Sequence, residues 1–90
     1  MFEGKKPVKN ERLTIINYLD SYYATIDQEH LYEIDPLVVG LLKYCDGKRK
    51  YEEILKELAE KTGFDESTLK NIVDEIFMEI TEMGFIKWID

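Results

Sequence analysis

The residues from Leu31 to Ile34 have the two-residue period of a β-strand. Leu31 and Glu33 fall on one face of the segment, and Tyr32 and Ile34 fall on the other. This period places successive side chains on opposite sides of a sheet. We therefore predict a short strand at this point of the chain.

An apolar helix is predicted directly after this strand. Asp35 can cap its first turn, and Pro36 suits the first helical position, where a missing N–H costs nothing. In the residues that follow, as far as Cys45, only Lys43 is charged, and Asp46-Gly47 then offers a helix stop. A short helix without a polar face must be enclosed by the rest of the domain, so we interpret it as the central helix.

Two more strands are predicted upstream of this unit. Residues 13–26 are rich in β-branched and aromatic side chains, which favour strands, and turn-like residues interrupt them at Asp20-Ser21 and after residue 26. A three-stranded antiparallel meander accounts for the pattern, and its third strand is an edge of the sheet. The predicted strands are Leu13–Leu19, Tyr22–Ile26 and Leu31–Ile34.

Two amphipathic helices are predicted in the C-terminal half. Apolar residues recur at helical spacing from Tyr51 to Lys61, before Gly63, and from Glu66 to Met83, after the cap Asp65. The turn between them gives a helix-turn-helix outline, and an extended tail after Gly84 makes it winged-helix-like. The predicted fold class is α+β, a three-stranded antiparallel sheet followed by three helices, winged helix-turn-helix-like.

A single domain accounts for this chain of 90 residues, which leaves room for one core. Residues 1–11 have no apolar periodicity, so we expect a flexible basic arm there and one domain over residues 12–90. No signal-peptide core and no bilayer-spanning apolar run occurs in the sequence. A cytoplasmic protein without a membrane partner is therefore the expectation.

Charge is unevenly distributed along the chain, whose formal net charge is −7. Residues 1–12 carry a net charge of +2, whereas residues 52–90 carry four lysines against eleven acids, a net of −7. The acidic C-terminal half should repel DNA and RNA and attract basic partners.

The sequence offers little for catalysis. His30 lies in a predicted turn, and Cys45 follows the apolar helix, where a small buried hydrophobe is expected. Acidic pairs such as Glu52-Glu53 fall on the polar faces of helices, and no histidine follows at the spacing that a metal site on a helix requires. The glycines are too far apart in the sequence to form a phosphate-binding loop. We therefore expect no enzyme activity, no bound metal and no cofactor.

Two apolar residues of the third helix leave two interpretations open. At ~100° per residue, Phe77 lies on the flank of the core stripe, and Met78 lies among acids. Apolar residues outside such a stripe can mark a partner site. Alternatively, Phe77 packs under the sheet or the tail, and Met78 is a lone exposed residue.

Several short motifs give the chain a resemblance to a known family. They are Tyr22-Tyr23, Leu31-Tyr32-Glu33-Ile34-Asp35, Asp46-Gly47-Lys48-Arg49, Glu52-Glu53-Ile54, Leu58, Asp65, Ile76 and Gly84-Phe85-Ile86. At this spacing, residues 12–87 resemble the PqqD-like family, the peptide recognition elements of ribosomal-peptide maturation. Lys50 departs from the Thr or Ser usual at that capping place, and Gly40 stands where Ala is common.

The resemblance implies a non-catalytic adaptor. Such domains bind the leader part of a precursor peptide as an added strand beside the third strand, in a groove walled by the third helix. They then present the peptide to a modifying enzyme, often a radical-SAM enzyme. The predicted peptide-binding residues are those of the third strand and of the third helix: Leu31, Tyr32, Glu33, Ile34, Lys70, Val73 and Phe77.

Two alternatives compete with this interpretation. A winged helix-turn-helix nucleic-acid-binding protein would use the basic arm and Lys48–Lys50. However, the third helix carries Lys70 against five acids, a net of −4, which repels phosphates, so we expect no nucleic acid partner. The edge of the third strand could also pair with a second copy and form a homodimer.

Overall fold

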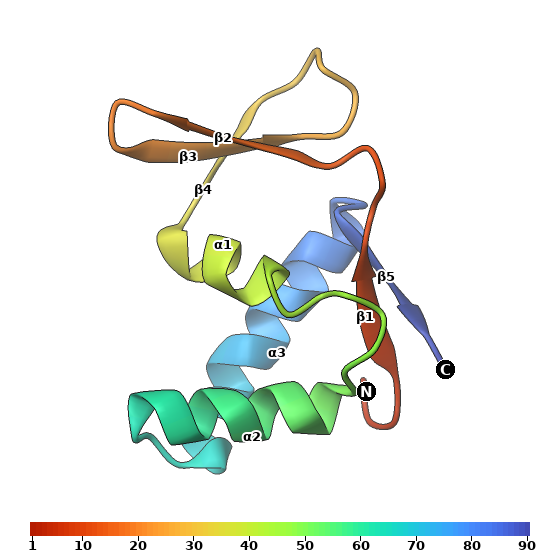
Figure 1. The fold of residues 1–90 in the computed structure, drawn as a ribbon, viewed down its shortest axis with the longest axis vertical. Coiled ribbons are helices and arrows are strands. Elements are labelled where there is room, and N and C mark those ends of the chain that lie inside the picture. The colour runs from red at the N-terminus through yellow and green to blue at the C-terminus, as the bar shows by residue number, and fades with distance from the viewer.

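The computed structural model describes residues 1–90 and contains five strands and three helices (Figure 1). A three-stranded antiparallel sheet precedes the helices, and a separate two-stranded sheet joins the two ends of the chain. The predicted α+β class is confirmed. In chain order the elements are β1 (Lys6–Lys9), β2 (Thr14–Tyr18), β3 (Ser21–Thr25), β4 (Tyr32–Ile34), α1 (Pro36–Leu42), α2 (Tyr51–Thr62), α3 (Glu66–Glu82) and β5 (Ile86–Ile89).

The larger sheet has the order β2-β3-β4, which confirms the predicted meander. β2 and β3 form a tight hairpin in which Tyr18 pairs with Ser21 across a two-residue loop. The loop residues Leu19 and Asp20 both have positive φ, 49° and 66°, as a type I′ turn requires. Only glycine, asparagine and aspartate adopt this conformation readily, so Leu19 is held there at a cost in free energy.

The N-terminal residues differ from the flexible arm that the sequence predicts. Lys6–Lys9 forms β1, which pairs antiparallel with β5. Phe2 and Pro7 are buried. The strand has no periodic pattern of its own because it is short and its partner lies at the opposite end of the sequence.

Side-chain caps fix the starts of two helices, at the residues that the sequence indicates. Asp35 accepts a hydrogen bond of 2.9 Å from the Leu37 N–H at the start of α1, and Asp65 accepts one of 2.8 Å from the Thr68 N–H at the start of α3. α2 lacks a side-chain cap of this kind at Lys50.

α1 ends at Leu42, three residues before the predicted end at Cys45. After the helix the chain reaches β1, where the Cys45 carbonyl accepts a hydrogen bond of 3.1 Å from the Lys9 N–H. The prediction of an enclosed helix is also wrong. Leu41 and Leu42 are buried, but Leu37 is 58% exposed.

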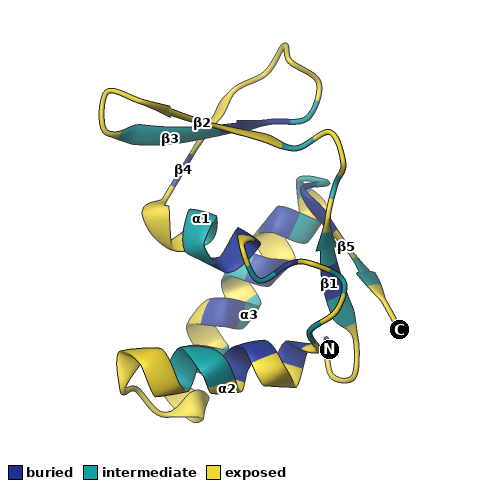
Figure 2. Cartoon of the chain, viewed as in Figure 1, coloured by how far each residue is buried: buried dark blue, intermediate teal, exposed yellow.

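The core lies where the three helices meet the smaller sheet, whereas β2 is exposed along its whole length (Figure 2). An aromatic cluster of Phe2, Tyr51, Phe77 and Trp88 fills one end of this core. None of the three helices has the length and apolar character needed to cross a bilayer.

Candidate functional site

β4 forms an open edge of the larger sheet. It pairs with β3 through Tyr22–Ile34, Tyr23–Glu33 and Ala24–Tyr32, and no strand lies on its other side. The predicted sheet edge is therefore confirmed. The backbone groups of β4 that face away from β3 have no partner within a sheet.

The hairpin shows which residue of β4 presents those groups. In a two-residue hairpin the flanking pair, here Tyr18–Ser21, is hydrogen-bonded, and bonded pairs then alternate along the ladder. Tyr22 and Ala24 of β3 consequently direct their N–H and C=O groups toward β4. Their partners in β4, Ile34 and Tyr32, direct the corresponding groups toward β3. The residue between those partners, Glu33, directs its N–H and C=O toward the open edge.

The side chains of β4 alternate as the sequence predicts. Ile34 is buried, and Tyr32, on the same face, contacts Phe85 with ring centres 6.1 Å apart. Glu33 is exposed on the opposite face. Leu31, just before the strand, is 59% exposed. Apolar side chains of Tyr32 and Leu31 therefore remain accessible beside the open backbone.

A groove of about 750 Å³ begins immediately beyond β4. Its lining includes Pro36 and Leu37 of α1 and Phe64 in the turn between α2 and α3. Leu37, Phe64 and Ile72 are each about half exposed or more. The apolar lining also includes Leu41, Leu58, Leu69, Val73 and Ile76.

The rim of this groove is basic, not acidic. Lys43, Arg49 and Lys61 line it together with one acid, Glu57, and no acid of α3 does so. Lys61 donates a hydrogen bond of 2.8 Å from Nζ to the Tyr44 hydroxyl, which raises the pKa of Lys61. Glu57 lies 3.5 Å from Arg49 Nε and 4.0 Å from Lys61 Nζ, so it neutralises part of this charge.

Of the three α3 residues predicted to bind the peptide, only Val73 lines the groove. Phe77 is completely buried, with its ring centre 4.9 Å from that of Trp88, so it belongs to the core under the C-terminal tail. Lys70 lies on the same side of α3 as Phe77. The predicted contacts of Phe77 and Lys70 with a peptide in this groove are therefore not supported by their positions.

Lys70 has a structural environment of its own. Its Nζ donates hydrogen bonds to the Tyr51 hydroxyl (2.9 Å) and to Asp74 (3.1 Å), and it approaches Glu3 at 3.4 Å. The bond to Tyr51, followed by the bond to Asp74, raises the pKa of Lys70. These contacts connect α2, α3 and the N-terminal residues.

The sequence does contain a signal for the groove residues that were missed. α1 has apolar residues on all sides, and Phe64 is apolar although it lies in a turn. The apolar residues of α1 and Phe64 could equally belong to a buried core, so the sequence alone does not assign them to a groove. Leu37 and Phe64 are instead exposed, and Ile72 of the predicted core stripe is 46% exposed.

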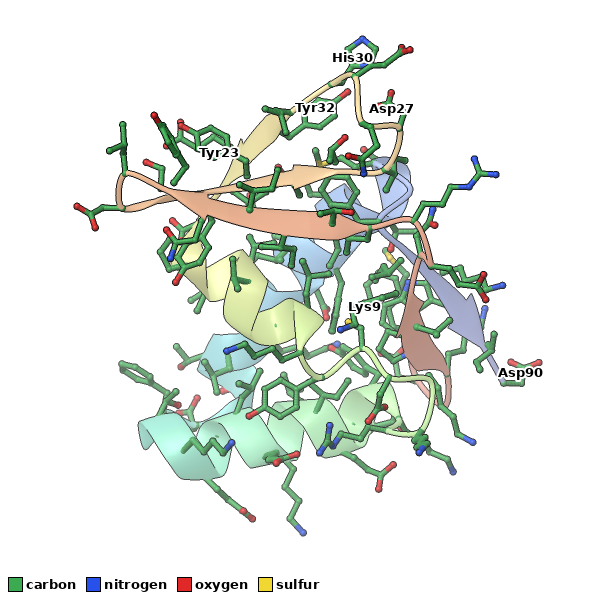
Figure 3. All side chains as sticks on the ribbon, turned by 45° about the horizontal axis from the view of Figure 1, so that its top comes forward. Lys9, Tyr23, Asp27, His30, Tyr32 and Asp90 are labelled. Atoms are coloured by element: carbon green, nitrogen blue, oxygen red, sulfur yellow. The ribbon has the colours of Figure 1, made fainter.

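Reactive side chains do not converge on the groove or on β4. His30 and Asp27 lie at the tip of the β3–β4 loop, away from the helices (Figure 3), with 2.7 Å between His30 Nδ1 and Asp27 Oδ2. This contact is the main reason why the pKa of Asp27 is lowered. Together with Glu29 they form a group of three exposed side chains of the kinds that can coordinate a metal ion. Cys45 is buried, and burial raises its pKa to about 12.

No family model, curated protein or solved structure matches the chain. The PqqD-like resemblance therefore stays a prediction.

Proposed function

We propose that the domain is a non-catalytic, PqqD-like adaptor that captures a precursor peptide by strand addition for a modifying enzyme, such as a radical-SAM enzyme. The single observation that carries this proposal is the open edge of β4, where the peptide group of Glu33 faces outward. An extended peptide can complete such an edge, because its own N–H and C=O groups match the vacant ones.

The groove supports the same proposal. Main-chain pairing gives affinity but little specificity, which comes from pockets for side chains. The groove begins at Pro36 and Leu37, so a peptide that leaves the end of β4 meets an apolar surface directly. Its volume of about 750 Å³ can take several apolar side chains.

The charges at the groove indicate the kind of peptide. Three cations against Glu57 give the lining a net charge of +2 within a chain whose net charge is −7. The preferred peptide therefore combines apolar anchors with carboxylates near Lys43 and Lys61. This differs from the basic peptide that the acidic third helix suggests, because the acids of α3 do not line the groove.

The test uses short peptides encoded beside the gene for this protein, titrated by isothermal calorimetry. Glu33→Pro removes the outward N–H without removing a donor to β3, and Glu33→Ala is its control because it keeps the N–H. We expect Glu33→Pro to weaken binding by roughly tenfold or more, since a lost main-chain bond costs about 1 kcal/mol and the ring adds a clash. Glu33→Ala should bind almost as the native domain does.

Equal affinity of the proline and alanine variants would count against strand addition. Tyr32→Pro is not a suitable substitute, because the Tyr32 N–H faces β3 and its loss would weaken the sheet itself. Circular dichroism of Glu33→Pro controls for a general loss of structure.

Self-pairing of β4 in a homodimer would occupy the same edge. Sedimentation over a range of protein concentrations distinguishes the two cases. If β4 is free to bind a peptide, peptide affinity should not depend on the protein concentration. If β4 pairs with a second copy, the dimer must dissociate before a peptide can bind, so peptide affinity should fall as the protein concentration rises.

A further inference from the structure

Three segments that are distant in the sequence form one surface at the side of the molecule where β1 and β5 lie (Figure 1). The residues 46–50 lie against β1, where the Gly47 N–H donates to the Pro7 carbonyl (2.8 Å) and the Tyr51 N–H donates to the Lys5 carbonyl (2.9 Å). β5 pairs with the other side of β1. We call residues 1–12, 46–50 and 86–90 the basic surface.

The fold concentrates positive charge on this surface. It holds eight lysines and arginines against four acids, a net charge of +4, whereas the rest of the chain holds four lysines against fifteen acids, a net of −11. The two basic stretches that are separate in the sequence, at the N-terminus and at Lys48–Lys50, thereby become neighbours. The molecule is strongly polarised, and such a field orients an approaching charged partner.

The cations of the basic surface are largely free of partners. Arg49 is the only one of the eight that forms an ion pair within the chain, with Asp46 at 3.2 Å and with Glu57 at 3.5 Å. Seven exposed or half-exposed cations thus keep their full capacity to bind an anion. The surplus of positive charge on this surface favours an external acidic partner.

A hollow at one end of the basic surface offers a place for an anionic group. It has a volume of about 430 Å³, and its lining includes Lys9, Arg12 and Lys87 with Glu11 as the one acid. None of the three cations forms an ion pair in the chain. A carboxylate entering this hollow would lie beside cationic residues contributed by β1, the following turn and β5.

We infer that the basic surface is a docking site for an acidic patch on a folded partner protein, with a carboxylate of that partner in the hollow of Lys9, Arg12 and Lys87. The surface is mostly lysine and has no exposed aromatic centre. Interfaces of this kind are small, transient and dependent on ionic strength. Such contact suits a domain that delivers a bound peptide and then leaves.

Two features favour a protein over a nucleic acid. A duplex carries a charge about every 1.7 Å along its axis and would extend from the basic surface over the acidic remainder of the molecule. The basic surface also lacks a stacking platform for single strands, because Trp88 is stacked on Phe2 in the core. A compact acidic patch can match the basic surface without meeting the acidic part.

The test uses an oligoglutamate peptide as a minimal acidic patch, titrated at low salt into isotope-labelled protein and followed by amide chemical shifts. We expect shifts confined to the basic surface and a loss of binding when salt is raised. The triple variant Lys9→Gln, Arg12→Gln, Lys87→Gln should weaken binding by roughly tenfold. Its control, Lys56→Glu with Asn71→Glu, makes the same change in net charge at two exposed residues outside the groove and the basic surface, and it should bind as the native protein does.

Equal weakening in the triple variant and in its control, or shifts spread over the whole molecule, would overturn the inference. Binding of duplex DNA at physiological salt, lost in the triple variant alone, would assign the surface to nucleic acid instead. The basic surface does not include β4, so Glu33→Pro should leave oligoglutamate binding unchanged. A failure of the peptide proposal is thereby distinguished from a failure of this one.

Discussion

The ring of Phe2 stacks on the indole of Trp88, with ring centres 4.4 Å apart and an angle of 11° between their planes. This contact holds the first residues of the chain against its last strand. Since Phe2 is only 7% exposed, Phe2→Ala should lower the free energy of unfolding by about 3 kcal/mol. Denaturant unfolding measures this change. A loss below about 1 kcal/mol, the size of a surface substitution, would mean that the N-terminal residues are not part of the core.

The hairpin loop should become more stable when its strained residue is replaced. Leu19 is 80% exposed and has a φ of 49°, a conformation that asparagine adopts far more readily. We expect Leu19→Asn to raise the free energy of unfolding by about 1 kcal/mol. Leu31→Asn, at another exposed leucine without positive φ, is the control and should not stabilise the protein. Thermal unfolding of the two variants decides the matter.

Cys45 should be unreactive in the native state. Burial, the main cause, raises its pKa from 9.0 to about 12, so the folded protein contains almost no thiolate at pH 8. Labelling by a thiol reagent should therefore follow unfolding, and it should become rapid in denaturant. Because the unfolded thiol ionises first, this group lowers stability as pH rises above 9. Rapid labelling in native buffer would contradict the buried position.

Two apolar residues of α3, Ile72 and Phe77, should respond very differently to substitution. Phe77 is completely buried, so Phe77→Ala should cost roughly 3–5 kcal/mol of stability. Ile72 is 46% exposed in the groove, so Ile72→Ser should cost less than about 1 kcal/mol and yet weaken peptide binding. Urea unfolding and calorimetric titration separate these effects. Similar costs for both variants would place Ile72 in the core and remove it from the groove.

Local signals explain why much of the fold could be predicted from the sequence. The caps at Asp35 and Asp65 and the left-handed Gly63 act on adjacent residues, so the chain itself marks the helix ends. The meander was predictable because turn residues separate segments rich in β-branched and aromatic side chains. Its edge then followed from strand order.

Contacts between distant segments were not predictable in the same way. The strand Lys6–Lys9 becomes apparent only when Ile86–Ile89 lies beside it. Phe77 belongs to the buried face of α3, and the sequence could not show that Phe2 and Trp88 pack against it. The apolar character of Leu37 likewise fits either a core or a groove, and only packing decides between them.

Amide hydrogen exchange at Tyr32, Glu33 and Ile34 shows whether a peptide pairs with the open edge of β4. In the free domain the Glu33 amide should exchange rapidly because it faces the open edge, whereas the amides of Tyr32 and Ile34, directed toward β3, should be protected. When a peptide binds, exchange of the Glu33 amide should become slow, and the exchange rates of the Tyr32 and Ile34 amides should not change. A Glu33 amide that still exchanges rapidly in the saturated complex would contradict strand addition at β4.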